Sequence, residues 1–228
     1  MPVNDDIRAE NSKLKNMTTK EKLLYIWDYY KIPIILGIVF VIFVFFLVKD
    51  LISNNRETYL TACILNSNYT YETDSSLVNE YVNFSGVDTE AMQLNMDFSM
   101  HIDLNAADQM SLAYQQKVMA LFAAKEIDVM VGDQNIIHSY ANAEAFCNLT
   151  ELLPADLATE LEQKGYTYYT ATYEDGTTAP VGLYMENCTR LKNDDTYPSS
   201  VRPIFAISAN APHPERAIEF LQFLISLD

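Results

Sequence analysis

The sequence predicts a mixed α/β domain preceded by one transmembrane helix. Two observations carry this prediction. One run of 17 residues, from Ile32 to Val48, contains no charged residue. After that run, short strand-like segments alternate with segments of helical periodicity, in the order β-α-β-α-β-α-α-β-β-β-α. Such an alternation is typical of a single sheet covered by helices.

The apolar run is nearly long enough to cross a bilayer by itself. With Leu51 and Ile52 behind a snorkelling Lys49, residues 32–52 reach the roughly 20 residues that a spanning helix needs. A cleaved secretory signal peptide is the alternative. However, about 31 residues precede the run, and no good small-x-small cleavage site follows it. We therefore expect a retained single-pass anchor in contact with the lipid bilayer.

The distribution of charge predicts the orientation of this anchor. Residues 1–31 carry six Lys or Arg, whereas residues 53–228 carry eight against 25 Asp or Glu, a formal charge of −17. The positive-inside rule places the N-terminal segment in the cytoplasm and residues 53–228 outside the cell. Only three cysteines lie in the outer part, which is typical of a bacterial cell-surface protein.

Aromatic residues gather where the membrane surface is expected. Thr18 and Glu21 match a capping box, so a juxtamembrane helix is predicted to begin there. The predicted interface residues are aromatic or basic and flank the apolar run: Tyr25, Trp27, Tyr29, Tyr30, Lys31 and Lys49. The alternative role for the aromatic residues is docking against another membrane protein.

The outer part contains one predicted sheet and its covering helices. Alternating or buried apolar patterns predict strands at 58–66, 92–100, 127–132 and 202–208, and a hairpin over 166–184 with Asp175-Gly176 at its turn. Helical periodicity predicts helices at 75–84, 106–126, 136–146, 154–164 and 212–227.

Several kinds of chemistry have no support in the sequence. The acidic outer part has no electrostatic reason to bind nucleic acid. No phosphate-binding glycine loop, nucleophile elbow or zinc-protease motif occurs, and the three histidines stand far apart, so no enzyme activity, cofactor or metal is expected. Asp194 and Asp195 are predicted to form a solvated turn. Cys63 is predicted to be a core residue, and whether Cys147 and Cys188 pair is left open.

Three segments resemble bacterial extracellular solute-binding proteins of the ABC-transporter type. The first is VMALFAAKEIDVMVGDQNIIHSYANAEAFCNLTELLP, in which Ile127, Asp128 and Val129 match the family's strand and Glu144, Phe146 and Asn148–Thr150 match the segment before a proline. The second is YEDGTTAPVGLYMEN. The third is PIFAISANAPHPERAIEFLQFLIS, a strand ending in Ile207-Ser208 followed by a helix. The three segments occur in the family's order.

The resemblance implies one lobe of such a protein, truncated and held by a helix. Family members have two lobes that close over a solute, but here only residues 188–201 separate the second segment from the strand at Arg202. A single lobe would bury only part of a small ligand. The predicted function is therefore a non-enzymatic, membrane-tethered accessory protein beside a transporter or another envelope complex. The alternative is a receptor for a weakly bound sugar or peptide.

The resemblance also places candidate contacts at the edge where the solute cleft of the family would lie. Ligands of open α/β sheets gather at the carboxyl ends of strands. The candidate ligand-binding residues are Asn66, Asp133, Gln134 and Tyr184. For Asp133 the competing interpretation, and the favoured one, is a cap on the helix that follows.

Overall fold

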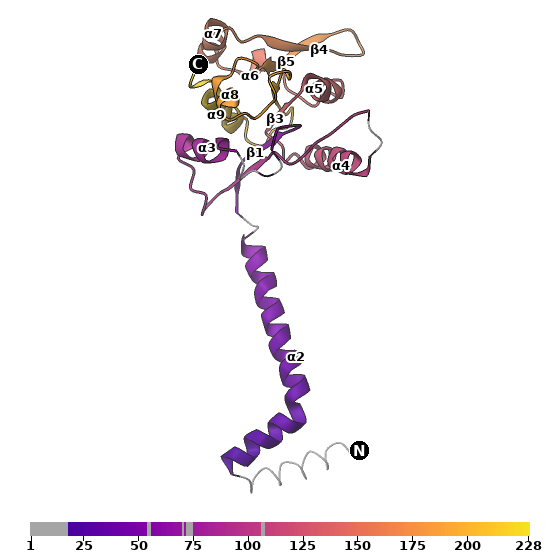
Figure 1. Ribbon diagram of the computed structural model, residues 1–228, viewed down its shortest axis with the longest axis vertical. Helices are drawn as coiled ribbons and strands as arrows, with labels where there is room; N and C mark the ends of the chain where they lie inside the picture. The colour runs from indigo at the N-terminus through magenta and orange to yellow at the C-terminus, as the bar shows by residue number, and fades with distance from the viewer. Residues whose placement is uncertain (1–17, 54–55, 70, 72–74, 106–107) are drawn as a thin grey trace. The chain divides into compact units, whose positions relative to one another are not determined.

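The computed structural model describes residues 18–53, 56–69, 71, 75–105 and 108–228. The chain divides into two compact units, Met1–Arg56 and Glu57–Asp228. The described residues form eight helices and six strands (Figure 1). Residues 1–17 of the predicted cytoplasmic segment, and the predicted helix start at 106–107, lie outside the described residues.

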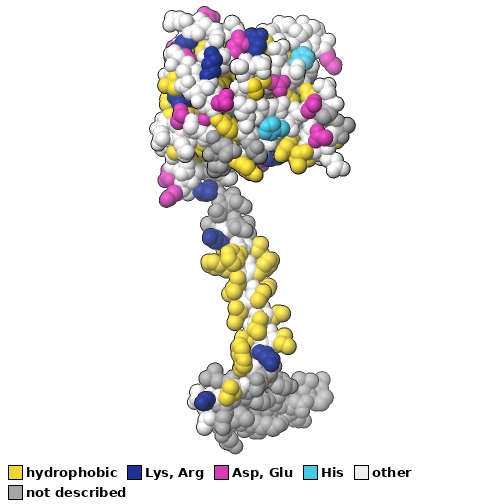
Figure 2. All heavy atoms as spheres, in the orientation of Figure 1, with side chains coloured by type: hydrophobic (Ala, Val, Ile, Leu, Met, Phe, Trp, Pro, Cys, Tyr) yellow, Lys and Arg dark blue, Asp and Glu magenta, His cyan; other side chains and the backbone are white. Residues whose placement is uncertain are grey.

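In the first unit, the described residues form one helix, α2 (Thr19–Ser53). Within it, Lys31–Lys49 has a mean hydropathy of 2.9 and is exposed along its length, so it is long and apolar enough to cross a membrane. Hydrophobic side chains cover its visible face (Figure 2). Lys31, Lys49 and Trp27 are exposed, whereas the side chains of Tyr25, Tyr29 and Tyr30 lie outside those described.

The described parts of the predicted juxtamembrane helix and of the predicted anchor at 32–52 lie in one continuous helix, because α2 runs through Pro33. A proline inside a helix removes one backbone hydrogen bond and favours a kink, but it does not require the helix to end. Figure 1 shows α2 bent in its N-terminal part.

The second unit contains one six-stranded sheet. Its strands are β1 (Thr58–Ile64), β2 (Gln93–Asp97), β3 (Val129–Gly132), β4 (Tyr168–Thr172), β5 (Thr178–Tyr184) and β6 (Ile204–Ile207). The spatial order is β2-β1-β3-β6-β5-β4. Strands β2, β1 and β3 are parallel, β6 is antiparallel to both β3 and β5, and β4 and β5 form the predicted hairpin. The prediction of a mixed α/β domain is confirmed.

Seven helices of this unit are described, and five of them correspond to predicted helices. Those five are α3 (Leu77–Ser85), α4 (Gln109–Ala124), α5 (Gln134–Ala141), α7 (Ala155–Gln163) and α9 (Pro214–Ile225). The short helices α6 (Leu149–Leu152) and α8 (Thr189–Asn193) were not predicted, because one turn is too short to show a period. Helix α5 ends earlier than predicted, since the chain leaves it to form a bridge between Phe146 and Ser208.

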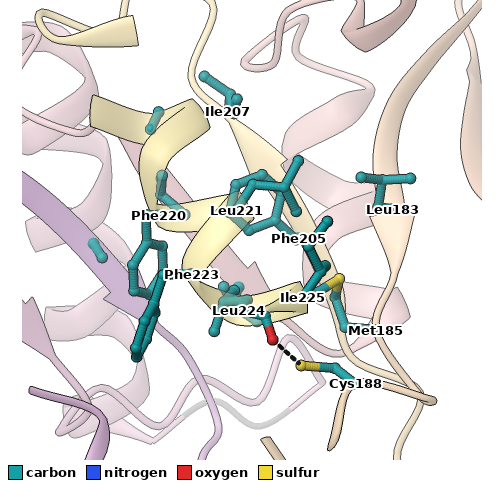
Figure 3. Close-up of a cluster of buried hydrophobic side chains, with 14 of the residues drawn as sticks. Leu183, Met185, Cys188, Phe205, Ile207, Phe220, Leu221, Phe223, Leu224 and Ile225 are labelled. Atoms are coloured by element: carbon teal, nitrogen blue, oxygen red, sulfur yellow. Dashed lines mark hydrogen bonds between the residues drawn. The ribbon is translucent and has the colours of Figure 1, made fainter. Parts of the chain in front are cut away.

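Two hydrophobic clusters cover the two faces of the sheet. The cluster on one face joins α3, α7 and α9 to the sheet, and its centre contains Phe205, Phe220 and Phe223 (Figure 3). The cluster on the other face contains Val118 of α4 and Ile137 of α5. The crossover from β1 to β2 through α3 and the crossover from β2 to β3 through α4 run in opposite directions along the sheet. Right-handed crossovers therefore place α3 and α4 on opposite faces.

Candidate functional site

The carboxyl edge of the sheet contains a topological switch point. The chain moves from β1 outward to β2 and then returns past β1 to β3, so the connections after β1 and β3 leave toward opposite faces. Ligands of open α/β sheets bind in the crevice that such a reversal creates. Asn66 lies just after β1 and Asp133 just after β3, so both predicted contacts lie at this point.

Asn66 and Asp133 are hydrogen-bonded to each other and to the backbone. The Asn66 Nδ2 atom donates to Asp133 Oδ2 at 2.8 Å and to the carbonyl oxygen of Ile102 at 2.9 Å. Its Oδ1 atom accepts from the N–H of Ile102 at 2.6 Å. The backbone of Asn66 is left-handed, with φ of 56°, a conformation that asparagine tolerates better than most residues.

The remaining oxygen of Asp133 caps helix α5. Asp133 Oδ1 accepts from the backbone N–H groups of Asn135 at 2.9 Å and Ile136 at 3.2 Å. The favoured interpretation of this residue, a helix cap, is confirmed. These polar groups bond to one another and to the backbone of the connection that follows β2, and Asn66 also lines a cavity of about 570 Å³ beside that connection.

The other two candidate contacts are separated from this pair. Gln134 is the first residue of α5, and its side chain is exposed. Tyr184 is the last residue of β5, which lies beyond β6 from β3. The Tyr184 ring packs edge-on against Tyr169 and lies 4.3 Å from the guanidinium carbon of Arg202. The structure therefore joins Asn66 to Asp133 but leaves Tyr184 at a second place on the same edge.

A cavity of about 490 Å³ lies near Tyr184 at this second place. Its lining includes Glu186, Arg202 and Lys192. The guanidinium of Arg202 forms a two-pronged ion pair with Glu186, and this hydrogen bonding lowers the pKa of the Glu186 carboxyl group. The cavity therefore presents paired charges and an arginine stacked on an aromatic ring.

Tyr197 is a buried part of the switch point that the sequence did not reveal. Its hydroxyl donates to the carbonyl oxygens of Leu65 at 3.0 Å and Val131 at 3.1 Å, which lie one residue before Asn66 and two residues before Asp133. Burial, followed by the nearby charge of Asp133, raises the pKa of Tyr197 well above its usual range. A lone tyrosine in a polar loop carries no periodic signal, so this contact depends on the tertiary fold.

Two buried carboxylates hold loops in place rather than forming a reactive pair. Asp128, fully buried, accepts from the backbone N–H groups of Thr61 at 2.8 Å and His213 at 2.7 Å, which joins the sheet to the start of α9. Asp194 is also buried and accepts from Ser75, Ser76 and Thr196. The prediction of a solvated turn was wrong for Asp194, because its carboxylate binds the N-terminus of α3.

The cysteine side chains offer no activated nucleophile. Cys63, Cys147 and Cys188 are all free thiols, so the pairing of Cys147 with Cys188 that the sequence left open is not present. Burial raises the pKa of Cys63 to about 12 and that of Cys147 to about 11, which keeps both thiols protonated at neutral pH. Within the described residues, no group of three His, Cys, Asp or Glu side chains is placed to hold a metal ion.

Comparison of the chain with protein-family models, with curated proteins and with solved structures found no match. The geometry alone therefore defines the candidate site as the carboxyl edge of the sheet, with an internally hydrogen-bonded junction at Asn66 and Asp133 and a cavity beside Tyr184. Such an edge can make directional contacts with a ligand or a protein surface.

Proposed function

We propose that this chain is a non-enzymatic accessory protein, anchored in a bacterial cell membrane by α2, whose acidic α/β domain binds a membrane or envelope partner outside the cell. One observation carries the proposal: the polar side chains at the switch point are occupied by internal hydrogen bonds. A site kept for a small ligand would present such groups to the ligand, whereas here they stabilise the surface of the domain.

The charge distribution supports the outward orientation of the domain. The basic residues before the apolar segment of α2 favour a cytoplasmic N-terminus. The negatively charged outer domain would be repelled by the anionic lipid head groups of the cytoplasmic leaflet. An open mixed sheet with a switch point between parallel strands is also compatible with one lobe of a solute-binding protein, which is the relationship that we propose for the fold. The transporter or envelope complex would then supply the surface that the missing lobe covers in that family.

A photo-reactive amino acid placed at exposed positions tests the accessory function in living cells. Met119 on α4 and Glu174 in the hairpin turn are suitable positions, because both side chains are exposed. We expect a discrete covalent adduct with one membrane or envelope protein from at least one position scanned over the domain. Absence of any adduct across the scanned surface would contradict the accessory function.

The cavity beside Tyr184 supports a second candidate, a small-ligand receptor for a sugar or a peptide. An open one-sided site should bind weakly, in the millimolar range, which corresponds to about −4 kcal/mol. Calorimetry of the full chain in detergent against sugars, peptides and amino acids tests this candidate. A micromolar ligand whose affinity falls at least tenfold in either Arg202→Ala or Asp133→Ala would replace the accessory function with the receptor.

A further inference from the structure

The outer side of helix α4 carries exposed apolar side chains. The inner side of the helix contains Ser111 and Val118, which are buried. Residues on the opposite side of the same helix are all exposed and none is charged: Leu112, Ala113, Gln116, Met119, Ala120 and Ala123. The two largest of them, Leu112 and Met119, are 47% and 65% exposed.

A helix that covers a sheet usually has charged residues on its outer side. Helix α7 follows this rule, because Leu157 is buried whereas Asp156 and Glu160 are exposed. In α4 the one charged residue is Lys117, and it forms an ion pair at the flank of the helix, with its Nζ atom 2.6 Å from Asp97 Oδ2. A contiguous exposed apolar surface marks a place of contact with another surface. The outer side of α4 therefore has the composition of an interface.

The spacing of these residues indicates that the contacting surface is another helix. Leu112, Gln116, Met119 and Ala123 follow one another at intervals of four, three and four residues. Such a spacing, with a mean of about 3.5 residues, forms the seam between two packed helices. Gln116 lies near the middle of α4, and a single polar residue within a seam fixes the register of the two helices.

The seam of α4 is complementary to itself. In an antiparallel pair with a two-fold axis beside Gln116, residues before the axis in one copy lie level with residues after it in the other. Leu112 of one copy then meets Met119 of the other, and Ala113 meets Ala120. The two Gln116 amides meet at the axis, where each can donate and accept a hydrogen bond. The antiparallel arrangement also places opposite ends of the two helix dipoles together.

Charge favours this side of the domain for contact between two copies. Residues 53–228 have a formal charge of −17, so two copies repel each other. The repulsion costs least where the surfaces that meet carry no charge, as on the outer side of α4. Salt screens such repulsion and leaves apolar contacts in place. Association through α4 is therefore expected to strengthen as the salt concentration rises.

We propose that α4 joins two copies of this chain as an antiparallel helix pair centred on Gln116. With 16 residues, α4 is about 24 Å long, and one such helix buries less than the roughly 800 Å² per partner of a standard interface. Confinement of anchored chains to one membrane raises their effective concentration and compensates for the small area. The inference goes beyond the proposed function and rests on it only for the membrane anchor.

Cysteine cross-linking of the full chain in membranes tests the proposed axis. Cys63 and Cys188 are buried, so Cys147→Ser removes the remaining native thiol. In that background, Gln116→Cys should give an adduct of two copies with a short bismaleimide, because the axis brings residue 116 next to its own copy. Thr159→Cys is the matched control, since it lies at an exposed position of α7 on the opposite face of the sheet. It should give no adduct above background.

A mixed cross-link tests the antiparallel register. Chains with Leu112→Cys and chains with Met119→Cys carry different tags and are expressed together. The mixed adduct should exceed either self-adduct at least fivefold, because like positions lie about 9–12 Å apart along the helix axis in the proposed pair. Self-adducts as abundant as the mixed adduct would indicate parallel or random association and would overturn the inference.

Substitutions at Met119 separate an apolar contact from chance collision in the membrane. Met119→Glu should reduce the Gln116→Cys adduct at least fivefold, whereas Met119→Leu should preserve it. Gln163→Glu adds the same charge at an exposed position of α7 and should leave the adduct unchanged. Raising the sodium chloride concentration should increase the adduct.

Several other outcomes would overturn the inference. They are an adduct at position 116 no greater than that at position 159, an adduct with a different protein in place of a second copy, or a decrease of the adduct at high salt. Recovery of the chain as a soluble protein would refute the anchor and with it the proposed function. A membrane-bound chain that forms no adduct would refute the helix pair alone.

Discussion

Replacing Asp133 by alanine should destabilise the outer domain rather than remove a ligand. The substitution deletes the cap of α5 and the acceptor for Asn66 Nδ2 at 2.8 Å. Loss of a helix cap costs about 1 kcal/mol, and loss of a hydrogen bond to a charged group costs about 1.5–3 kcal/mol. We therefore expect a decrease of about 2–4 kcal/mol in the free energy of unfolding, which for a domain of this size corresponds to about 4–16 °C in Tm.

Thermal melts of the full chain in detergent, followed by near-UV circular dichroism, measure this change. Gln134→Ala is the matched control, because its exposed side chain lies next to the cap and should change the free energy by about 0.5 kcal/mol or less. Asn66→Gly removes the amide yet preserves the left-handed backbone. The double variant of Asp133 and Asn66 should be less destabilised than the sum of the single variants. A Tm change below 2 °C for Asp133→Ala would refute the structural role.

Further predictions concern packing, thiol reactivity and pH. Gly182→Ala should cost about 1–3 kcal/mol, because the new Cβ atom would lie 2.6 Å from a methyl carbon of Ile204, whereas Gly132→Ala meets its neighbours at 3.6 Å and should cost less in the same melts. With a pKa of about 12, Cys63 should react with maleimide at pH 8 only after unfolding, and fast labelling of the native chain would contradict its burial. Because the pKa of Asp97 is lowered by folding, its contribution to stability should be present above about pH 4 and be lost as the pH falls through its folded pKa. The difference in Tm between the wild type and Lys117→Met should therefore shrink in acid, and a constant difference would contradict the ion pair.

Much of the fold could be predicted because its elements carry strong local signals. The apolar run predicted the central segment of α2. Alternating or continuous apolar patterns predicted β1, β2, β3 and β6 within a few residues of their observed bounds. The Asp175-Gly176 turn gave the hairpin.

The candidate site could be predicted only in part, because its contacts depend on tertiary structure. Asn66 and Asp133 follow adjacent parallel strands, so their proximity follows from topology. The hydrogen bonds between the Asn66 side-chain amide and the backbone of Ile102, in the connection after β2, could not be predicted from any sequence pattern. Asp194 looked like a surface turn residue, but Ser75 and Ser76, which donate to its carboxylate, lie 119 and 118 residues earlier in the chain.

Cysteine labelling in intact cells tests most directly whether α2 is a retained anchor with the acidic domain outside. In a background with Cys147 replaced by serine, Asp175→Cys places a thiol in the exposed hairpin turn, and Thr19→Cys places one at the exposed start of α2. We predict that a membrane-impermeant maleimide labels the full-length, membrane-bound Asp175→Cys chain in intact cells and labels Thr19→Cys only after lysis. The reverse pattern, or a soluble chain that has lost its first 52 residues, would contradict the proposed anchor and its orientation.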